Sequence, residues 1–278
     1  MPLNLGAIGK TVGPFEHTYD WDDIVLYNLA LGTPAAQLDY LLDPEPKVLP
    51  TWGVIPATLP VFAVLELAGG SLTRLLHSAQ LTEQLRPLPP RGTVSTSATL
   101  LGIWDMRIGA LLQVETRSSI RDELYARTVW TCLIAGEGNF QSERAPALLR
   151  TKPPKDAAPD FSTSWITLPT QALLYRLTGD LNPIHARPEA AREGGLEQPI
   201  LHGLCTYGFA ARAALASLCG GDPRRFRSLE ARFTKPVLPG QTLKASGYVL
   251  APGEAALTVQ VEETGELAIA NALFRYEE

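Results

Sequence analysis

The sequence is poor in the residues that build disulfides and metal centres. It has three cysteines, Cys132, Cys205 and Cys219, and only four histidines in 278 residues. An odd number of cysteines without a Cys-x-x-Cys spacing indicates reduced thiols in a cytoplasmic protein rather than a disulfide framework. No cysteines or histidines are paired at the spacing of a metal site, so we expect no metal ion.

Basic charge and long apolar runs are also scarce. Lysine and arginine number 24 against 29 acidic residues, which excludes a general attraction to nucleic acid or to an anionic membrane. No apolar run reaches the roughly 18 residues expected of a membrane span. Residues 1–6 lack the charged start and apolar core of a secretory signal, and residues 275–278 are not a peroxisomal tripeptide signal. We therefore expect a cytoplasmic protein with neither a nucleic-acid nor a membrane partner.

Two weak similarities at nearly the same offset indicate an internal repeat. Residues 24–29 resemble 172–177, with the two tyrosines 148 positions apart, and residues 86–93 resemble 235–242 at an offset of 149. Each similarity is common alone, so chance alignment is the alternative. A duplicated unit is the interpretation we favour, because repeated architectures show similarity at a fixed period.

The proline-rich stretch 152–160 has the composition of a linker between the two copies. We therefore divide the chain into domains 1–150 and 151–278. The copies differ after their shared tyrosine, since the first reads Leu-Gly-Thr-Pro at 31–34 and the second reads Gly-Asp-Leu-Asn-Pro-Ile-His at 179–185. Because only the second carries ionisable groups, we expect one active site, in the C-terminal half.

Local patterns predict an α+β fold in which a curved antiparallel sheet wraps around a long helix in each unit. Residues 203–219 contain a single charge and predict a buried helix. Alternating apolar residues predict strands. In the second half these are 243–250, 256–261 and 267–276, and in the first half 94–101, 110–117 and 124–134. Residues 56–76 carry helical signals around a Gly-Gly break, without clear ends.

Residues 179–185 are the most informative segment. Gly179 permits backbone geometries that other residues resist, and Pro183 disfavours helix at the residue before it. The result is a non-helical loop that holds Asp180, Asn182 and His185 close together. A carboxylate and an imidazole fixed in this way can exchange protons with one bound water. The alternative is an ordinary turn in which Asp180 is a cap and His185 a surface residue.

The segment that follows favours the catalytic interpretation. Gly203 lies at the start of the predicted apolar helix, where free N–H groups and the positive end of the helix dipole collect. Such a position can stabilise a developing oxyanion. Close packing of helix against sheet is the alternative reason for a glycine there, and both can hold.

Residues 175–185 together with 199–212 closely resemble the hydratase 2 family of (R)-specific enoyl-CoA hydratases, relatives of the MaoC-like dehydratases. The resemblance implies a double hotdog fold, with two repeated units of curved antiparallel sheet around a long helix. In that family the C-terminal unit is active. The N-terminal unit is degenerate and accommodates the acyl chain.

The resemblance also assigns roles to residues. It places the catalytic acid–base pair on Asp180 and His185, the supporting asparagine on Asn182 and the oxyanion-hole glycine on Gly203. The substrate-binding positions that it implies are Leu181, Pro183, Ile184, Phe233, His77 and Ser78. The first half departs from the family at 77–80, where His-Ser-Ala-Gln replaces His-Gly-Glu-Gln. The chemistry is therefore better supported than the acyl pocket.

We accordingly predict a lyase that reversibly adds water, in syn geometry, to trans-2-enoyl-CoA and gives (3R)-3-hydroxyacyl-CoA. Its partner is the acyl-CoA substrate. CoA is part of that substrate, and we expect no separate cofactor. The oligomeric state is left open, with a homodimer as one possibility. Three alternatives remain. They are a dehydratase acting on carrier-protein-bound 3-hydroxyacyl thioesters, a hotdog thioesterase, since fold alone does not give function, and a non-catalytic acyl-CoA scaffold.

Overall fold

The computed structural model describes residues 2–148 and 150–278, and its core is one continuous antiparallel sheet of ten strands. The first half contributes β1 (Thr11–Tyr19), β2 (Leu75–Gln84), β3 (Gly92–Asp105), β4 (Gly109–Ile120) and β5 (Glu123–Ala135). The second half contributes β6 (Phe161–Ile166), β7 (Phe226–Phe233), β8 (Thr242–Ala251), β9 (Glu254–Val261) and β10 (Leu267–Tyr276). The division at 150/151 falls between β5 and β6, and the two-domain assignment stays a prediction.

The strand order is the same in both halves. From one edge the sheet runs β1-β3-β4-β5-β2, and from the other edge it runs β6-β8-β9-β10-β7. The halves join where β2 pairs with β7, with Ala79 opposite Arg232 and Glu83 opposite Ser228. This matching order supports the duplication that the sequence offset indicated.

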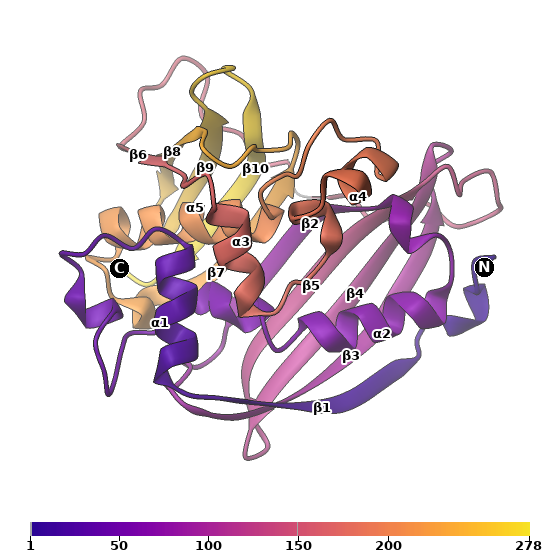
Figure 1. Ribbon diagram of the computed structural model, residues 1–278, viewed down its shortest axis with the longest axis horizontal. Coiled ribbons are helices and arrows are strands. Elements are labelled where there is room, and N and C mark those ends of the chain that lie inside the picture. The colour runs from indigo at the N-terminus through magenta and orange to yellow at the C-terminus, as the bar shows by residue number, and fades with distance from the viewer. Residues whose placement is uncertain (1, 149) are drawn as a thin grey trace.

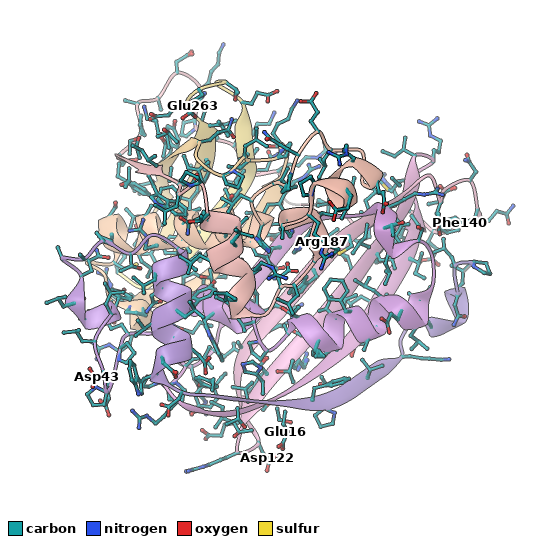
Figure 2. The ribbon with its side chains drawn as sticks, viewed as in Figure 1. Glu16, Asp43, Asp122, Phe140, Arg187 and Glu263 are labelled. Carbon is teal, nitrogen blue, oxygen red and sulfur yellow. The ribbon has the colours of Figure 1, made fainter. Side chains whose placement is uncertain are left out.

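Each half carries one long helix across a face of its own strands (Figure 1). The first is α2 (Thr58–Ala68), which packs on β1, β3 and β4, and the second is α5 (Gly203–Leu218), which packs on β7 to β10. Nearly every residue in the first three turns of α5 is buried, as its apolar composition predicted. Side chains fill the space between these helices and the sheet (Figure 2).

Shorter helices complete the repeat. They are α1 (Trp21–Ala30) in the first half, and α3 (Gln171–Tyr175) and α4 (Pro188–Glu193) in the second. Helices α1 and α3 lie side by side, and the rings of Tyr27 and Tyr175 are 6.1 Å apart with both residues fully buried. The repeated tyrosines therefore meet in the shared core of the two halves.

Residues Pro50–Ala68, which include α2, correct one expectation. By length and composition this segment is apolar enough to cross a membrane, with a mean hydropathy of 1.5. Its most apolar window is 67% buried inside the protein, which is typical of a core helix.

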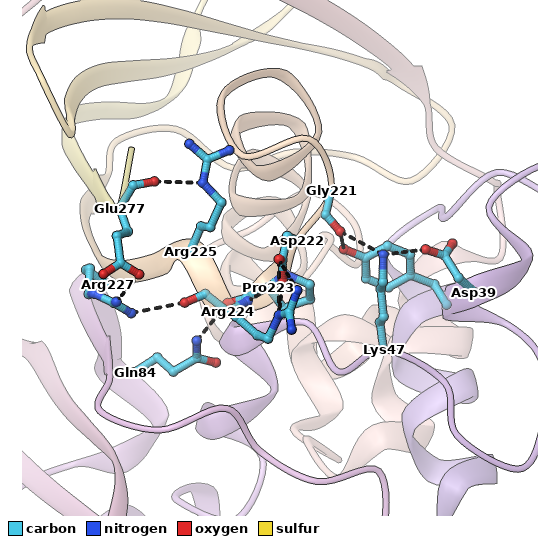
Figure 3. A network of polar contacts seen from close by, with 11 residues as sticks. Asp39, Lys47, Gln84, Gly221, Asp222, Pro223, Arg224, Arg225, Arg227 and Glu277 are labelled. Atoms are coloured by element: carbon cyan, nitrogen blue, oxygen red, sulfur yellow. Dashed lines mark hydrogen bonds and ion pairs between the residues drawn. The ribbon is translucent and has the colours of Figure 1, made fainter.

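A polar network fixes the C-terminal end of α5 to the first half (Figure 3). Lys47 Nζ and Tyr40 Oη both donate to the carbonyl of Gly221, at 3.2 and 2.8 Å. Gln84 Nε2 donates to the carbonyl of Pro223 at 2.7 Å. Because these contacts hold α5 at its far end, the position of its N-terminus, at Gly203, is set relative to both halves.

Candidate active site

The 179–185 segment follows a 3-10 turn at Arg176–Thr178 and itself ends in a second one at Pro183–His185. The predicted non-helical loop is therefore confined to residues 179–182, because Asn182 caps the second turn. Gly179 has a φ of +131°, so the chain can leave the first turn in a direction that L side chains rarely permit. The Asp180 carboxylate then accepts the N–H of Asn182 at 3.1 Å, and the Asn182 side chain accepts the N–H of Ile184 at 3.2 Å. These side-chain bonds to the backbone replace helical bonds and hold the loop in shape.

His185 lies at the end of this loop with its ring buried. Its Nδ1 is 2.9 Å from the carbonyl oxygen of Ile200, which can only accept, so Nδ1 carries the proton. Nε2 therefore keeps its lone pair free to accept a proton. Burial lowers the pKa of His185, while the negative charge of Asp180 and the bond to Ile200 act in the opposite direction. The neutral imidazole is the form expected at neutral pH.

His202 stands directly against His185. The two rings are stacked with centroids 3.7 Å apart and 27° between their planes, and His202 is only 1% exposed. Its Nε2 lies 3.1 Å from the backbone carbonyl of Asp180. Burial, reinforced by repulsion from His185, lowers the pKa of His202 to about 2. The sequence pattern predicts no role for this residue, although it precedes Gly203 at the helix start and is one of four histidines.

The three side chains form one cluster. A carboxylate oxygen of Asp180 and one ring nitrogen each of His185 and His202 lie within 4.8 Å of one another. Two hydrogen bonds of ordinary length through one water span about 5.6 Å, so a single water fits between Asp180 and His185. A shared metal fits poorly, since ligand lone pairs lie in the ring planes and stacked rings direct them side by side rather than toward one ion.

Gly203 is the first residue of α5, where backbone N–H groups have no partner within the helix. A Cβ added there would lie 3.3 Å from two ring carbons of Phe233, so this ring covers the helix start. The ring of His77 meets Phe233 edge-on at 5.0 Å and stacks on Trp130 at 4.8 Å. Residues of both halves therefore border the helix start.

The other sequence-predicted binding residues are less closely tied to the cluster. Leu181 and Pro183 are exposed and Ile184 is half-buried, all on the loop itself. Ser78 donates to the carbonyl of Leu76 at 3.4 Å. Within residues 2–148 and 150–278 no hydrogen bond joins Ser78 to the loop. The binding roles of these residues stay predictions.

The equivalent loop of the first half is filled by apolar packing. Gly32, aligned with Asp180, has a φ of +67°, and a Cβ there would lie 2.4 Å from the indole of Trp165. Leu31 is fully buried, and its side chain would lie 2.6 Å from a Cβ at Gly208 of α5. The first copy therefore has neither ionisable groups nor open space at this position.

Comparison with known proteins agrees with this architecture. Residues 150–271 match the MaoC-like domain family, and residues 17–136 match the MFE-2 hydratase 2 N-terminal domain family. A crystal structure of a MaoC-like dehydratase from Phytophthora capsici superposes with a TM-score of 0.88 at 29% identity, covering 99% of this chain and 98% of that one. The predicted α+β double hotdog fold is confirmed.

Two curated relatives cover most of the chain. An enoyl-CoA hydratase of Mycobacterium tuberculosis is 37% identical over 254 residues, which span 87% of this chain and 88% of the relative. The peroxisomal enoyl-CoA hydratase 2 of Arabidopsis thaliana is 34% identical over 252 residues, which span 82% and 81%. The resemblance stated from the sequence motifs is thereby confirmed. By the match of both halves and by these relatives, the chain belongs to the hydratase 2 family of MaoC-like dehydratases.

Proposed function

We propose that this protein is an enoyl-CoA hydratase, which reversibly adds water to trans-2-enoyl-CoA in syn geometry and gives (3R)-3-hydroxyacyl-CoA. The observation that carries the proposal is the placement of Asp180 and His185, within 4.8 Å of each other, on a loop packed against the start of α5. The family supports the same reaction, and the (3R) product rests on the family alone.

The reaction needs a base, an acid and an oxyanion site. The β-carbon of an enoyl thioester is electrophilic because negative charge can move to the thioester oxygen. Water held between Asp180 and His185 gives up a proton as its oxygen bonds to the β-carbon, and a proton from the same pair reaches the α-carbon on the same face. The N–H of Gly203 stabilises the charge on the thioester oxygen. Asn182 shapes the loop that presents Asp180.

This scheme moves protons but neither electrons nor hydride. CoA therefore arrives as part of the substrate, and we propose no separate cofactor and no metal. The degenerate first half would accommodate the acyl chain, with Phe233 and His77 at the boundary between the halves. We keep the cytoplasm as the proposed location. A homodimer is compatible with the scheme, which needs no residue from a second copy.

The proposed substrate is a thioester of CoA, whereas the alternative substrate is a thioester of a carrier protein. Arg187 follows two residues after His185, is exposed and lies beside α4 (Figure 2). A cation there could meet the phosphates of CoA. Arg187→Ala should then raise KM for crotonyl-CoA and leave KM for crotonyl-pantetheine unchanged. An equal change for both thioesters would contradict this contact.

One comparison of substrates separates the proposed function from its alternatives. Purified protein is given crotonyl-CoA, the same acyl group on a carrier protein, and a saturated acyl-CoA. The proposal expects loss of enoyl absorbance with crotonyl-CoA and no release of free CoA from the saturated thioester. Turnover confined to the carrier-protein substrate, or thioester cleavage, would refute it.

A further inference from the structure

We propose that His202 is a positioning residue, which holds Asp180 in place by donating its Nε2–H to the backbone carbonyl of that residue. The inference rests on the proposed function, because it concerns the geometry of the same acid–base pair. His202 itself bonds to a backbone carbonyl and is given no proton-transfer step.

The contacts of residues 200–202 carry the argument. The carbonyl of Ile200 receives Nδ1–H of His185, and Nε2–H of His202 reaches back to the carbonyl of Asp180. Residues 200–202 therefore form hydrogen bonds to both ionisable residues of the 179–185 loop. The next residue, Gly203, begins α5 and offers the proposed oxyanion donor. Acid, base and oxyanion site are thus set by consecutive residues of one chain segment.

The remaining nitrogen of His202 shows that stability alone does not explain this residue. Nδ1 is buried and finds no hydrogen-bond partner in the part of the chain that the structure describes. A buried polar atom without a partner destabilises a fold, so an apolar ring would serve packing better. The imidazole gains one hydrogen bond, to the carbonyl of Asp180, and ring contacts with His185 and Tyr175.

The surroundings of His202 also explain why it stays neutral. It faces His185 on one side and the ring of Tyr175, 4.9 Å away, on another, and the positive charge of Arg176 acts on it. A second imidazolium against His185 would oppose any positive charge there. A neutral ring instead leaves His185 free to hold a proton during turnover.

Amide substitutions separate the hydrogen bond from the ring. The side-chain nitrogen of Gln sits as many bonds from Cβ as Nε2 of histidine, whereas that of Asn corresponds to Nδ1. His202→Gln can therefore keep the donor to Asp180, while His202→Asn and His202→Phe cannot. The matched controls are His17→Gln and His17→Phe, since His17 lies on β1 in the other half.

Steady-state hydration of crotonyl-CoA by all variants tests the proposal. His202→Asn and His202→Phe should lose about 10-fold or more in kcat with KM within about 3-fold of wild type, because small misplacements of reacting groups are costly. His202→Gln should keep kcat within about 3-fold, and the His17 controls should match wild type. Equal kcat for the Gln and Asn variants would overturn the proposal. If the Phe variant fails to fold, the comparison of the Gln and Asn variants still tests the proposal.

A second readout does not depend on turnover. In nitrogen-15 spectra, wild-type His202 should be the neutral Nε2–H tautomer and His185 the Nδ1–H tautomer, and the His185 signals should shift in the Asn variant but less in the Gln variant. If wild type shows these tautomers without hydrating crotonyl-CoA, the proposed function fails and the positioning contact stands. Any other tautomer of His202 would refute the contact itself.

Discussion

The carbonyl oxygen of Ile200 lies 2.9 Å from Nδ1 of His185, and this contact decides which ring nitrogen can react. Since a carbonyl only accepts, the proton resides on Nδ1 and the lone pair on Nε2. The orienting group is thus a backbone atom rather than a second carboxylate. Asp180 is therefore free to act on the water or substrate instead of holding the imidazole.

The pH dependence of hydration should reflect the burial of His185. Burial lowers the pKa of this ring, so it stays neutral, and able to accept a proton, to a lower pH than an exposed histidine. We expect kcat/KM to fall on the acid side with a midpoint below the ordinary value of 6.5. Rates on crotonyl-CoA from about pH 5 to 9 measure it. An acid-side midpoint above about 7 would contradict a buried neutral base.

The folded state should lose stability as the pH falls below 6.5. Burial lowers the pKa of His77 to about 4 and that of His202 to about 2. Below pH 6.5 the unfolded chain therefore binds protons that the folded chain does not bind. The stability contributed by the neutral rings is fully present above pH 6.5 and declines as the pH falls toward the folded-state pKa values. Urea unfolding at pH 7 and 5 should show the lower midpoint at pH 5.

The His202→Gln variant provides the control for that measurement. It lacks one of the buried rings, so its stability should decline less between the two pH values than that of wild type. Equal or greater stability of wild type at the lower pH would show that the rings are accessible to protons in the folded state.

A methyl group at Gly203 should interfere with the reaction more than with the fold. The backbone there is helical and tolerates alanine, but the new Cβ would press on the Phe233 ring at 3.3 Å. We expect Gly203→Ala to keep wild-type unfolding behaviour and to lower kcat/KM by about 10-fold or more. Unchanged kcat/KM would mean that the thioester does not approach this helix start.

Each chain should bind one acyl-CoA. The first-half loop is closed by Trp165 over Gly32 and by Leu31 against α5, so only the second half offers a site. Isothermal titration with a non-reactive acyl-CoA analogue should give a stoichiometry of about one. A fitted stoichiometry near two, with equal affinities, would contradict the asymmetry between the copies.

Much of the fold could be predicted because its signals are local. The apolar helix at 203–219 appears as Gly203–Leu218, the strand at 267–276 appears with the predicted ends, and the other five predicted strands appear longer than predicted. Four strands, β1, β2, β6 and β7, were missed. In β2 the buried side chains include Gln80 and Thr82, each 0% exposed, so apolar alternation is lost at the junction of the two halves. In β1 most residues are exposed at the sheet edge, which also weakens the pattern.

The site divides in the same way. The part of the site that could be predicted is local in sequence. It comprises Asp180, Asn182 and His185, and the turn-forming residues beside them predict the loop. The bond of His202 to Asp180 spans 22 residues, and the contact of His77 with Phe233 exists only because β2 pairs with β7. Such contacts depend on the path of the whole chain, and no local pattern encodes them.

The acid–base pair is tested most directly by the hydration rates of Asp180→Asn and His185→Ala on crotonyl-CoA, followed by loss of enoyl absorbance with chiral analysis of the product. Each variant should fold, bind acyl-CoA and lose at least about 10²-fold in turnover. The double variant should be little slower than the slower single variant, because the two groups act as a unit. Near wild-type turnover in both single variants would mean that the pair is structural and that the chemistry lies elsewhere.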